Sequence, residues 1–87
     1  MNKYVIVYQG KGLMGWYPNN NFYGSVKDII RFSTKQYYTF DTYEEAELKT
    51  MQMLIDMCKM EGEIKLSFKV YDIVKKLTII EMKGGNT

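Results

Sequence analysis

A capped helix near the middle of the chain limits the folds open to this sequence. Asp41 or Thr42 can cap the helix, since a glutamate stands at the third position in either case and its charge favours the positive helix end. Helical character continues to Met60, and Gly62 is a natural stop. A chain of only 87 residues has room for one hydrophobic core. This helix, over about 42–60, must therefore pack against the elements that the rest of the chain forms.

Strand-like segments lie on both sides of this helix. Blocks of β-branched and aromatic residues predict strands at 4–8, 13–17, 36–40, 64–70 and 77–82. The clearest alternation is that of Ile64, Leu66, Phe68 and Val70 with polar residues between them, which is typical of a half-buried strand. Ser25, with Asp28 three residues later, predicts a short helix near 26–31.

These elements predict an α+β fold: a small antiparallel sheet of four to five strands, with the main helix packed on one face. A break at about 72–76 is expected before the last strand. We expect a single globular domain over 1–83 and a flexible C-terminal tail over 84–87.

The side chains available for chemistry are few. The chain has no histidine and one cysteine, Cys58, which excludes a histidine-based triad, a disulfide framework and the usual zinc ligand sets. Cys58 falls in the apolar part of the helix, where we expect it to be buried and unreactive. The glutamates at 44, 45 and 47 are explained by the helix start. We therefore expect no catalytic residue, no cofactor, no metal and no enzymatic activity.

The glycine-rich segment 10–15 matches the pattern G-x-G-x-x-G and follows a predicted strand. A dinucleotide site would need a helix directly after these glycines, with its N-terminus at the phosphates. Trp16, Tyr17 and Pro18 stand there instead, and Pro18 also ends the second strand. The sequence therefore predicts a glycine-rich hairpin.

The helix over 42–60 has more apolar surface than one sheet needs. A broad stripe that includes Met53 and Met57 is flanked by Met51, while Leu48 and Ile55 lie beyond that flank. Two interpretations stay open: loops around Trp16 or Phe22 cover the excess, or Leu48, Met51 and Ile55 meet a partner, which includes a second copy in a homodimer through the helix flank.

Aromatic residues gather in or beside the predicted loops. Tyrosine and tryptophan are common at binding hot spots, because a large ring is buried while its OH or N–H keeps a partner. At least half of these aromatics are expected to belong to the core. For the surface, and for partner binding, we predict Trp16, Tyr17, Tyr23 and Tyr37.

Lysines suggest an alternative function. Lys65 and Lys69 would share one face of the strand predicted at 64–70, and Lys75 and Lys76 follow closely. Such a group can contact phosphates while tyrosines stack on bases, as in single-stranded nucleic-acid binders. The net charge of +2 is low for that role, and lysines on the open face of a strand also serve solubility.

Several features bear on the compartment. The segment after Met1 leads directly into a strand pattern without the cleavage site of a signal peptide, and no apolar run is long enough to span a bilayer. One unpaired cysteine fits a reducing compartment. We expect a cytoplasmic protein without membrane contact.

The order of segments 3–6, 26–32 and 40–46, with a glycine-containing turn and Trp16 between the first two, resembles small phage and prophage proteins of Gram-positive bacteria. The resemblance implies an accessory or defence-inhibiting protein that acts in the host cytoplasm by binding a host or phage protein. It carries no functional residues over to this chain. The resulting expectation is a non-enzymatic protein-binding module, with single-stranded nucleic-acid binding as the alternative.

Overall fold

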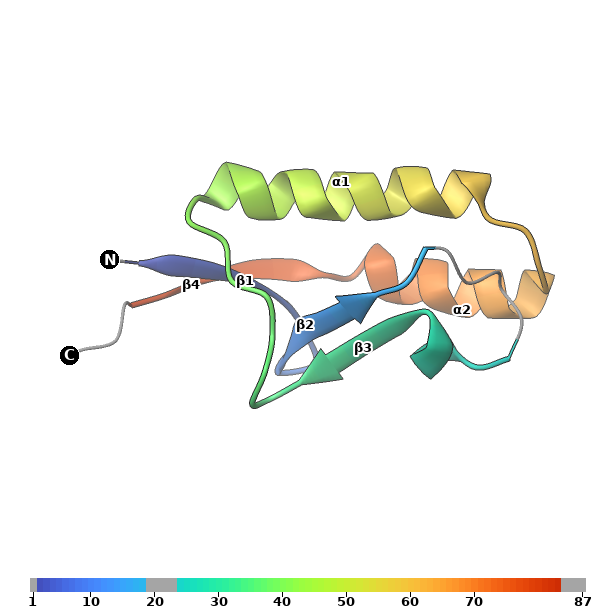
Figure 1. Ribbon diagram of the computed structural model, residues 1–87, viewed down its shortest axis with the longest axis horizontal. Coiled ribbons are helices and arrows are strands. Elements are labelled where there is room, and N and C mark those ends of the chain that lie inside the picture. The colour runs from blue at the N-terminus through green and yellow to red at the C-terminus, as the bar shows by residue number, and fades with distance from the viewer. Residues whose placement is uncertain (1, 19–23, 84–87) are drawn as a thin grey trace.

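The computed structural model describes residues 2–18 and 24–83. Within these ranges the chain forms a four-stranded antiparallel sheet in the order β3-β2-β1-β4 and two α-helices, which confirms the α+β class (Figure 1). In chain order, the elements are β1 (Lys3–Tyr8), β2 (Lys11–Trp16), the 3-10 helix η1 (Val26–Asp28), β3 (Ile30–Ser33), α1 (Tyr43–Lys59), α2 (Ile64–Val74) and β4 (Thr78–Met82). The tail over 84–87 lies outside the described residues.

The glycine-rich segment forms the predicted hairpin. Gln9 and Gly10 both have positive φ, 51° and 77°, and they join Tyr8 to its cross-strand partner Lys11. Two such residues make the turn whose twist matches the flanking strands, which is why glycine suits the second position. The backbone thus continues into β2 instead of opening a helix.

The main helix forms as predicted. The Thr42 hydroxyl accepts a hydrogen bond from the Glu45 backbone N–H at 3.1 Å, and α1 ends at Lys59. Ala46 and Met53 are completely buried against the core residue Ile6 of β1 and its neighbours. α1 contacts β1, β4 and α2, and it forms the outermost layer on its side of the molecule (Figure 1).

The strand predicted at 64–70 is wrong, since this segment belongs to α2, which also includes most of the predicted break at 72–76. When apolar residues stand at every second position, some of them also stand four positions apart, which is about one turn of a helix. The pattern at 64–70 therefore fits a helix as well as a strand. The helix buries Leu66, Val70 and Val74, which are four residues apart, and leaves Ile64 and Phe68 about two-thirds exposed. One helix on the sheet therefore becomes a pair of neighbouring helices (Figure 1).

The predictions between 25 and 40 need a second correction. Only Val26–Asp28 is helical, and the rest of the predicted short helix enters β3, where Ile30 pairs with Trp16. The segment 36–40 is not a strand: it contributes one isolated bridge, in which Phe40 and Tyr4 exchange backbone hydrogen bonds of 2.9 Å. It passes beside β1 and β2 and so occupies the place where a strand was expected.

Candidate functional site

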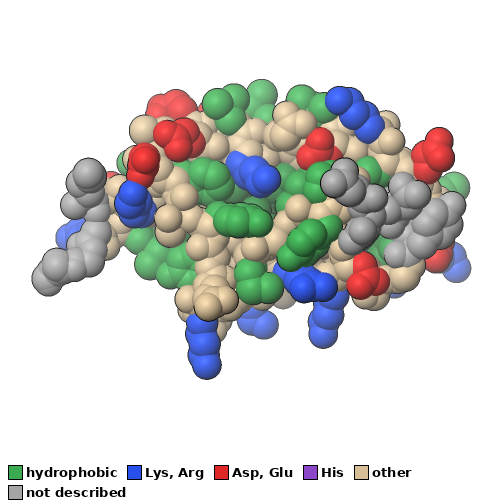
Figure 2. Space-filling view, in the orientation of Figure 1, with side chains coloured by type: hydrophobic (Ala, Val, Ile, Leu, Met, Phe, Trp, Pro, Cys, Tyr) green, Lys and Arg blue, Asp and Glu red, His purple; other side chains and the backbone are tan. Residues whose placement is uncertain are grey.

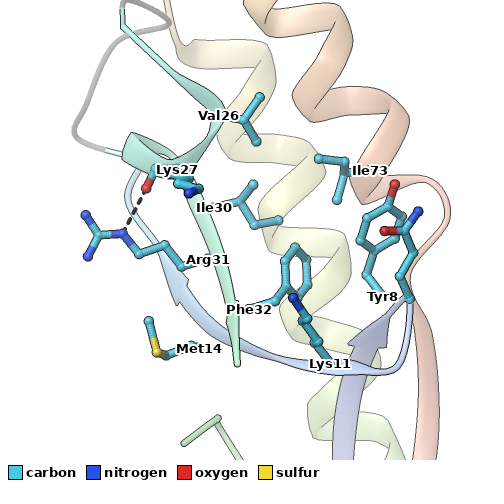
Figure 3. A pocket seen from close by; sticks show the side chains of 10 residues that line it. Tyr8, Lys11, Met14, Val26, Lys27, Ile30, Arg31, Phe32 and Ile73 are labelled. Carbon is cyan, nitrogen blue, oxygen red and sulfur yellow. Dashed lines mark hydrogen bonds between the residues drawn. The ribbon is translucent and has the colours of Figure 1, made fainter. Parts of the chain in front are cut away.

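A groove of about 430 Å³ opens at one end of the sheet. Its lining comes from the β1–β2 hairpin, η1, β3 and the end of α2. Figure 3 shows apolar side chains around the opening, and these are Tyr8, Val26, Ile30, Phe32 and Ile73. The rings of Tyr8 and Phe32 lie 5.4 Å apart at a tilted angle. The groove thus offers aromatic and aliphatic surface to a ligand.

Three cations, Lys11, Lys27 and Arg31, also line the groove, together with Gln9 and Met14. No carboxylate lines it among the described residues, and none of these cations takes part in an ion pair with them. The Arg31 Nε donates to the Lys27 carbonyl oxygen at 2.8 Å (Figure 3), and its guanidinium lies 5.1 Å from the centre of the Tyr17 ring. These contacts fix the Arg31 side chain while its terminal N–H groups stay free to donate to an anion.

The acidic residue nearest in sequence, Asp28, is engaged in the cap of η1. It accepts hydrogen bonds from the Ser25 backbone N–H at 2.9 Å and from the Ser25 hydroxyl at 3.2 Å. The backbone hydrogen bond, followed by the hydroxyl bond and the charge of Arg31, lowers the pKa of Asp28 below its ordinary value. Asp28 is therefore ionised at neutral pH and serves the cap predicted at Ser25.

Trp16 is not a surface residue, so this part of the aromatic prediction is wrong. Only 6% of the residue is exposed, and its indole N–H donates to the Asp56 carboxylate at 2.8 Å. Burial of the indole is favourable because Asp56 of α1 accepts a hydrogen bond from the indole N–H, the one polar group of the side chain. Trp16 thus joins β2 to α1 and cannot touch a partner without unfolding that junction.

The other aromatic predictions have different outcomes. Tyr17 is 37% exposed and lies beside Arg31, close to the groove. Tyr37 is half-buried on the far face of the sheet, where it covers Gly12 and its hydroxyl is 3.6 Å from the Met82 sulfur. Tyr23 lies outside the described residues. The structure therefore places Tyr17 and Tyr37 over different parts of the sheet.

Leu48 and Ile55 are exposed, at 62% and 48%, and so is Met51 between them. Of the two interpretations of the apolar excess, cover by the described residues is thus wrong for these side chains. Cys58 is exposed as well, which corrects the expectation that it is buried. These four residues form what we call the α1 ridge, on the side of α1 away from the sheet.

The four lysines of the alternative function do not form one surface of free cations. Lys65 and Lys69 are exposed on α2, but Lys75 and Lys76 both pair with Asp72, at 3.4 and 3.0 Å. The hydrogen bond to Asp72 raises the pKa of Lys76, and the hydrogen bond from Lys76 lowers the pKa of Asp72. An intramolecular carboxylate thus already compensates part of this charge.

The sequence does not reveal the groove cations as one group. Arg31 is predicted in the short helix near 26–31 but lies in β3, whereas Lys11 and Lys27 lie in the predicted hairpin and short helix, and no local pattern shows that the three line one groove. The signal that could have found them is the alternation of Ile30 and Phe32 with Arg31, which is a strand pattern with a cation on one side.

Across the described ranges, no three His, Cys, Asp or Glu side chains come close enough to hold a metal ion. Neither of the described α-helices is long and apolar enough to cross a membrane. Comparison with protein-family models, curated proteins and solved structures gave no match.

Proposed function

We propose that this protein is a non-enzymatic protein-binding module that holds an extended segment of a partner, rich in acidic and apolar residues, at the groove beside β3. The observation that supports this proposal is the combination of an apolar floor with three cations, none of which forms an ion pair with a described residue, although the nearby Asp28 compensates part of the charge of Arg31. An apolar side chain of the partner fills the groove, and its carboxylates meet Lys11, Lys27 and Arg31.

The position of the groove favours an extended partner. β3 is an edge strand, so one side of its backbone is not paired within the sheet. A peptide can add to such an edge through main-chain hydrogen bonds, while alternate side chains enter the neighbouring groove. If the chain is the phage accessory protein that the resemblance suggests, the partner is a host or phage protein.

The test uses two labelled peptides of equal length. In one, glutamate alternates with leucine and phenylalanine; in the other, lysine replaces glutamate. Fluorescence anisotropy should show binding of the acidic peptide and weak or no binding of the basic one. Arg31→Glu should weaken binding about tenfold or more, because it replaces an attraction with a repulsion.

Lys69→Glu is the matched control, since it makes the same charge change on an exposed part of α2 that does not line the groove. It should bind the acidic peptide like the unaltered protein. An equal loss in both variants would show that net charge alone drives binding, and would contradict the proposed site. Tight binding of oligothymidine that weakens steeply with salt and is lost in Lys69→Glu would support the nucleic-acid alternative instead.

A further inference from the structure

The helix α1 carries a second apolar face that the fold does not use. The α1 ridge residues Leu48, Met51, Ile55 and Cys58 are separated by three, four and three positions. This spacing is that of the a and d positions of a heptad repeat, which forms the seam between two paired helices. At about 100° per residue, the ridge points away from the buried residues Ala46 and Met53.

The ridge is open to the outside. Leu48, Met51 and Ile55 are 62%, 52% and 48% exposed, and Cys58 is exposed too. Figure 2 shows hydrophobic side chains along the upper edge of the molecule, over α1 as it is drawn in Figure 1. In Figure 1, α1 lies along the upper edge of the molecule, and no other described helix or strand is drawn above it.

The charges beside the ridge indicate how that second helix runs. Glu45, Gln52 and Lys59 follow one another at seven-residue spacing along the same flank, so the flank changes from acidic to basic along the helix. In an antiparallel pair, flanks of this kind face each other in reverse order, which sets Glu45 against a lysine and Gln52 against a glutamine. A parallel pair would instead place the acidic starts of both helices side by side and align their dipoles unfavourably.

We propose that two copies of this chain associate through their α1 ridges as an antiparallel, two-fold symmetric pair. In this register Met51 faces the partner's Ile55, and Leu48 faces the partner's Cys58. Glu45 of each copy lies near the partner's Lys59, so the two copies form this ion pair twice. One patch meeting its own copy about a two-fold axis is the commonest geometry of homodimers.

The size of the ridge sets the expected strength. α1 has 17 residues, so the contact is about 25 Å long and one helix wide. Such an interface is at the small end of the range for specific complexes, below about 1,200 Å² in total. We therefore expect a reversible dimer with a dissociation constant on the order of micromolar, visible by analytical ultracentrifugation as mass that rises with concentration.

Cysteine cross-linking tests the register. The variant Leu48→Cys sets a new thiol opposite the partner's Cys58, and diamide, a two-electron oxidant, converts each such pair of thiols to a disulfide and takes up their two protons. We expect rapid formation of a doubly linked dimer. Lys69→Cys, with its new thiol on α2, is the control and should cross-link no faster than the unaltered protein.

The unaltered protein should resist this oxidation. In the antiparallel register, Cys58 lies ten positions from the partner's Cys58 along the axis, about 15 Å. A disulfide needs Cα atoms within about 7 Å. Efficient linkage through Cys58 alone would indicate a parallel pair and would overturn the proposal, as would a Leu48→Cys variant that links no faster than the control.

A charge exchange gives a second, independent measurement. Glu45→Lys should weaken the dimer by about tenfold or more, because each copy then sets a lysine against the partner's Lys59. The double variant with Lys59→Glu should restore it. A protein that stays monomeric at millimolar concentration, or a double variant no more dimeric than the single one, would contradict the proposal. Arg31→Glu should leave the dimer unchanged, which separates this outcome from that of the groove.

Discussion

Trp16 shows how one polar atom decides the place of a large side chain. Its indole N–H reaches the Asp56 carboxylate at 2.8 Å, and the Gln52 amide binds the second carboxylate oxygen at 2.9 Å. With its one donor satisfied, the ring can be buried among the core residues. The sequence places Trp16 and Asp56 40 positions apart, so nothing local in the sequence indicates this contact.

Replacing this tryptophan tests the contact. Trp16→Phe keeps an aromatic ring but removes the donor, and Asp56 then keeps its bond from Gln52 alone. We expect a loss of about 2 kcal/mol in the free energy of unfolding, the usual scale for a hydrogen bond to a charged group. Urea unfolding measures it. Tyr17→Phe, at the exposed neighbouring position, should change stability little; equal effects of the two changes would contradict the contact.

The same carboxylate predicts a dependence on pH. Desolvation acts to raise the pKa of Asp56, but hydrogen bonds from Trp16 and Gln52, with the charges of Lys49 and Lys59, lower it below its ordinary value of 3.8. Because the folded pKa is the lower one, this stabilisation is present above pH 3.8 and is lost as the pH falls through the folded pKa. Thermal unfolding of Asp56→Asn should depend less on pH across this window, and an unchanged profile would contradict the assignment.

Two glycines of β2, Gly12 and Gly15, differ in what an added side chain would meet. A Cβ at Gly12 would lie 2.7 Å from the Tyr37 Cβ, which is fixed to the backbone, whereas at Gly15 it would meet the movable end of the Tyr17 side chain. We expect Gly12→Ala to destabilise the fold by about 1–3 kcal/mol and Gly15→Ala to cost less. The double variant Gly12→Ala/Tyr37→Ala should recover part of the loss. A larger cost at Gly15 would be inconsistent with this packing.

At the scale of elements, local signals suffice for some segments and not for others. The helix at 42–60 has a cap, a long periodic run and a glycine stop, so the sequence alone predicts α1. For α2, the alternation at 64–70 fits a strand and a helix equally. Val74 lies one helical turn beyond Val70, so it continues the helical spacing and favours the helix. β3 forms because it pairs with β2, which is a distant segment of the chain. A local residue pattern does not indicate such a pairing.

The two conformations of the segment 64–74 predict opposite effects at an exposed position. In a helix, alanine at position 69 is more favourable than threonine by about 0.5 kcal/mol, whereas a strand prefers threonine. We therefore expect Lys69→Ala to unfold at a higher urea concentration than Lys69→Thr. The reverse order would contradict the helical assignment of α2.

The candidate site was only partly predictable. Helical geometry places Leu48 and Ile55 beyond the flank of the core stripe, but it leaves open whether loops cover them, and only the structure shows that both are exposed. The groove could not be predicted from the sequence, because its lining comes from a hairpin, an edge strand and the end of α2. The alternating pattern at 64–70 predicted a strand where α2 lies. Lys11, Lys27 and Arg31 come from β2, η1 and β3, and they line one groove only in the folded structure.

At the scale of the whole molecule, the two proposed surfaces do not compete. The protein measures 45 × 23 × 20 Å, and no residue of α1 lines the groove. Pairing through the α1 ridge therefore leaves both grooves of the dimer open. Such a dimer would carry two equal sites. A partner that has repeated segments, or that is itself dimeric, would occupy both sites and bind with a higher overall affinity through avidity.

Chemical-shift mapping tests the binding claim most directly. The ¹⁵N-labelled protein is titrated with the peptide in which glutamate alternates with leucine and phenylalanine, and amide shifts are recorded for each residue. We expect shifts centred on 8–11, 26–32 and Ile73, with the amides of Lys65 and Lys69 unaffected. Shifts centred on α2 or on the α1 ridge, or no shifts at millimolar peptide, would contradict it.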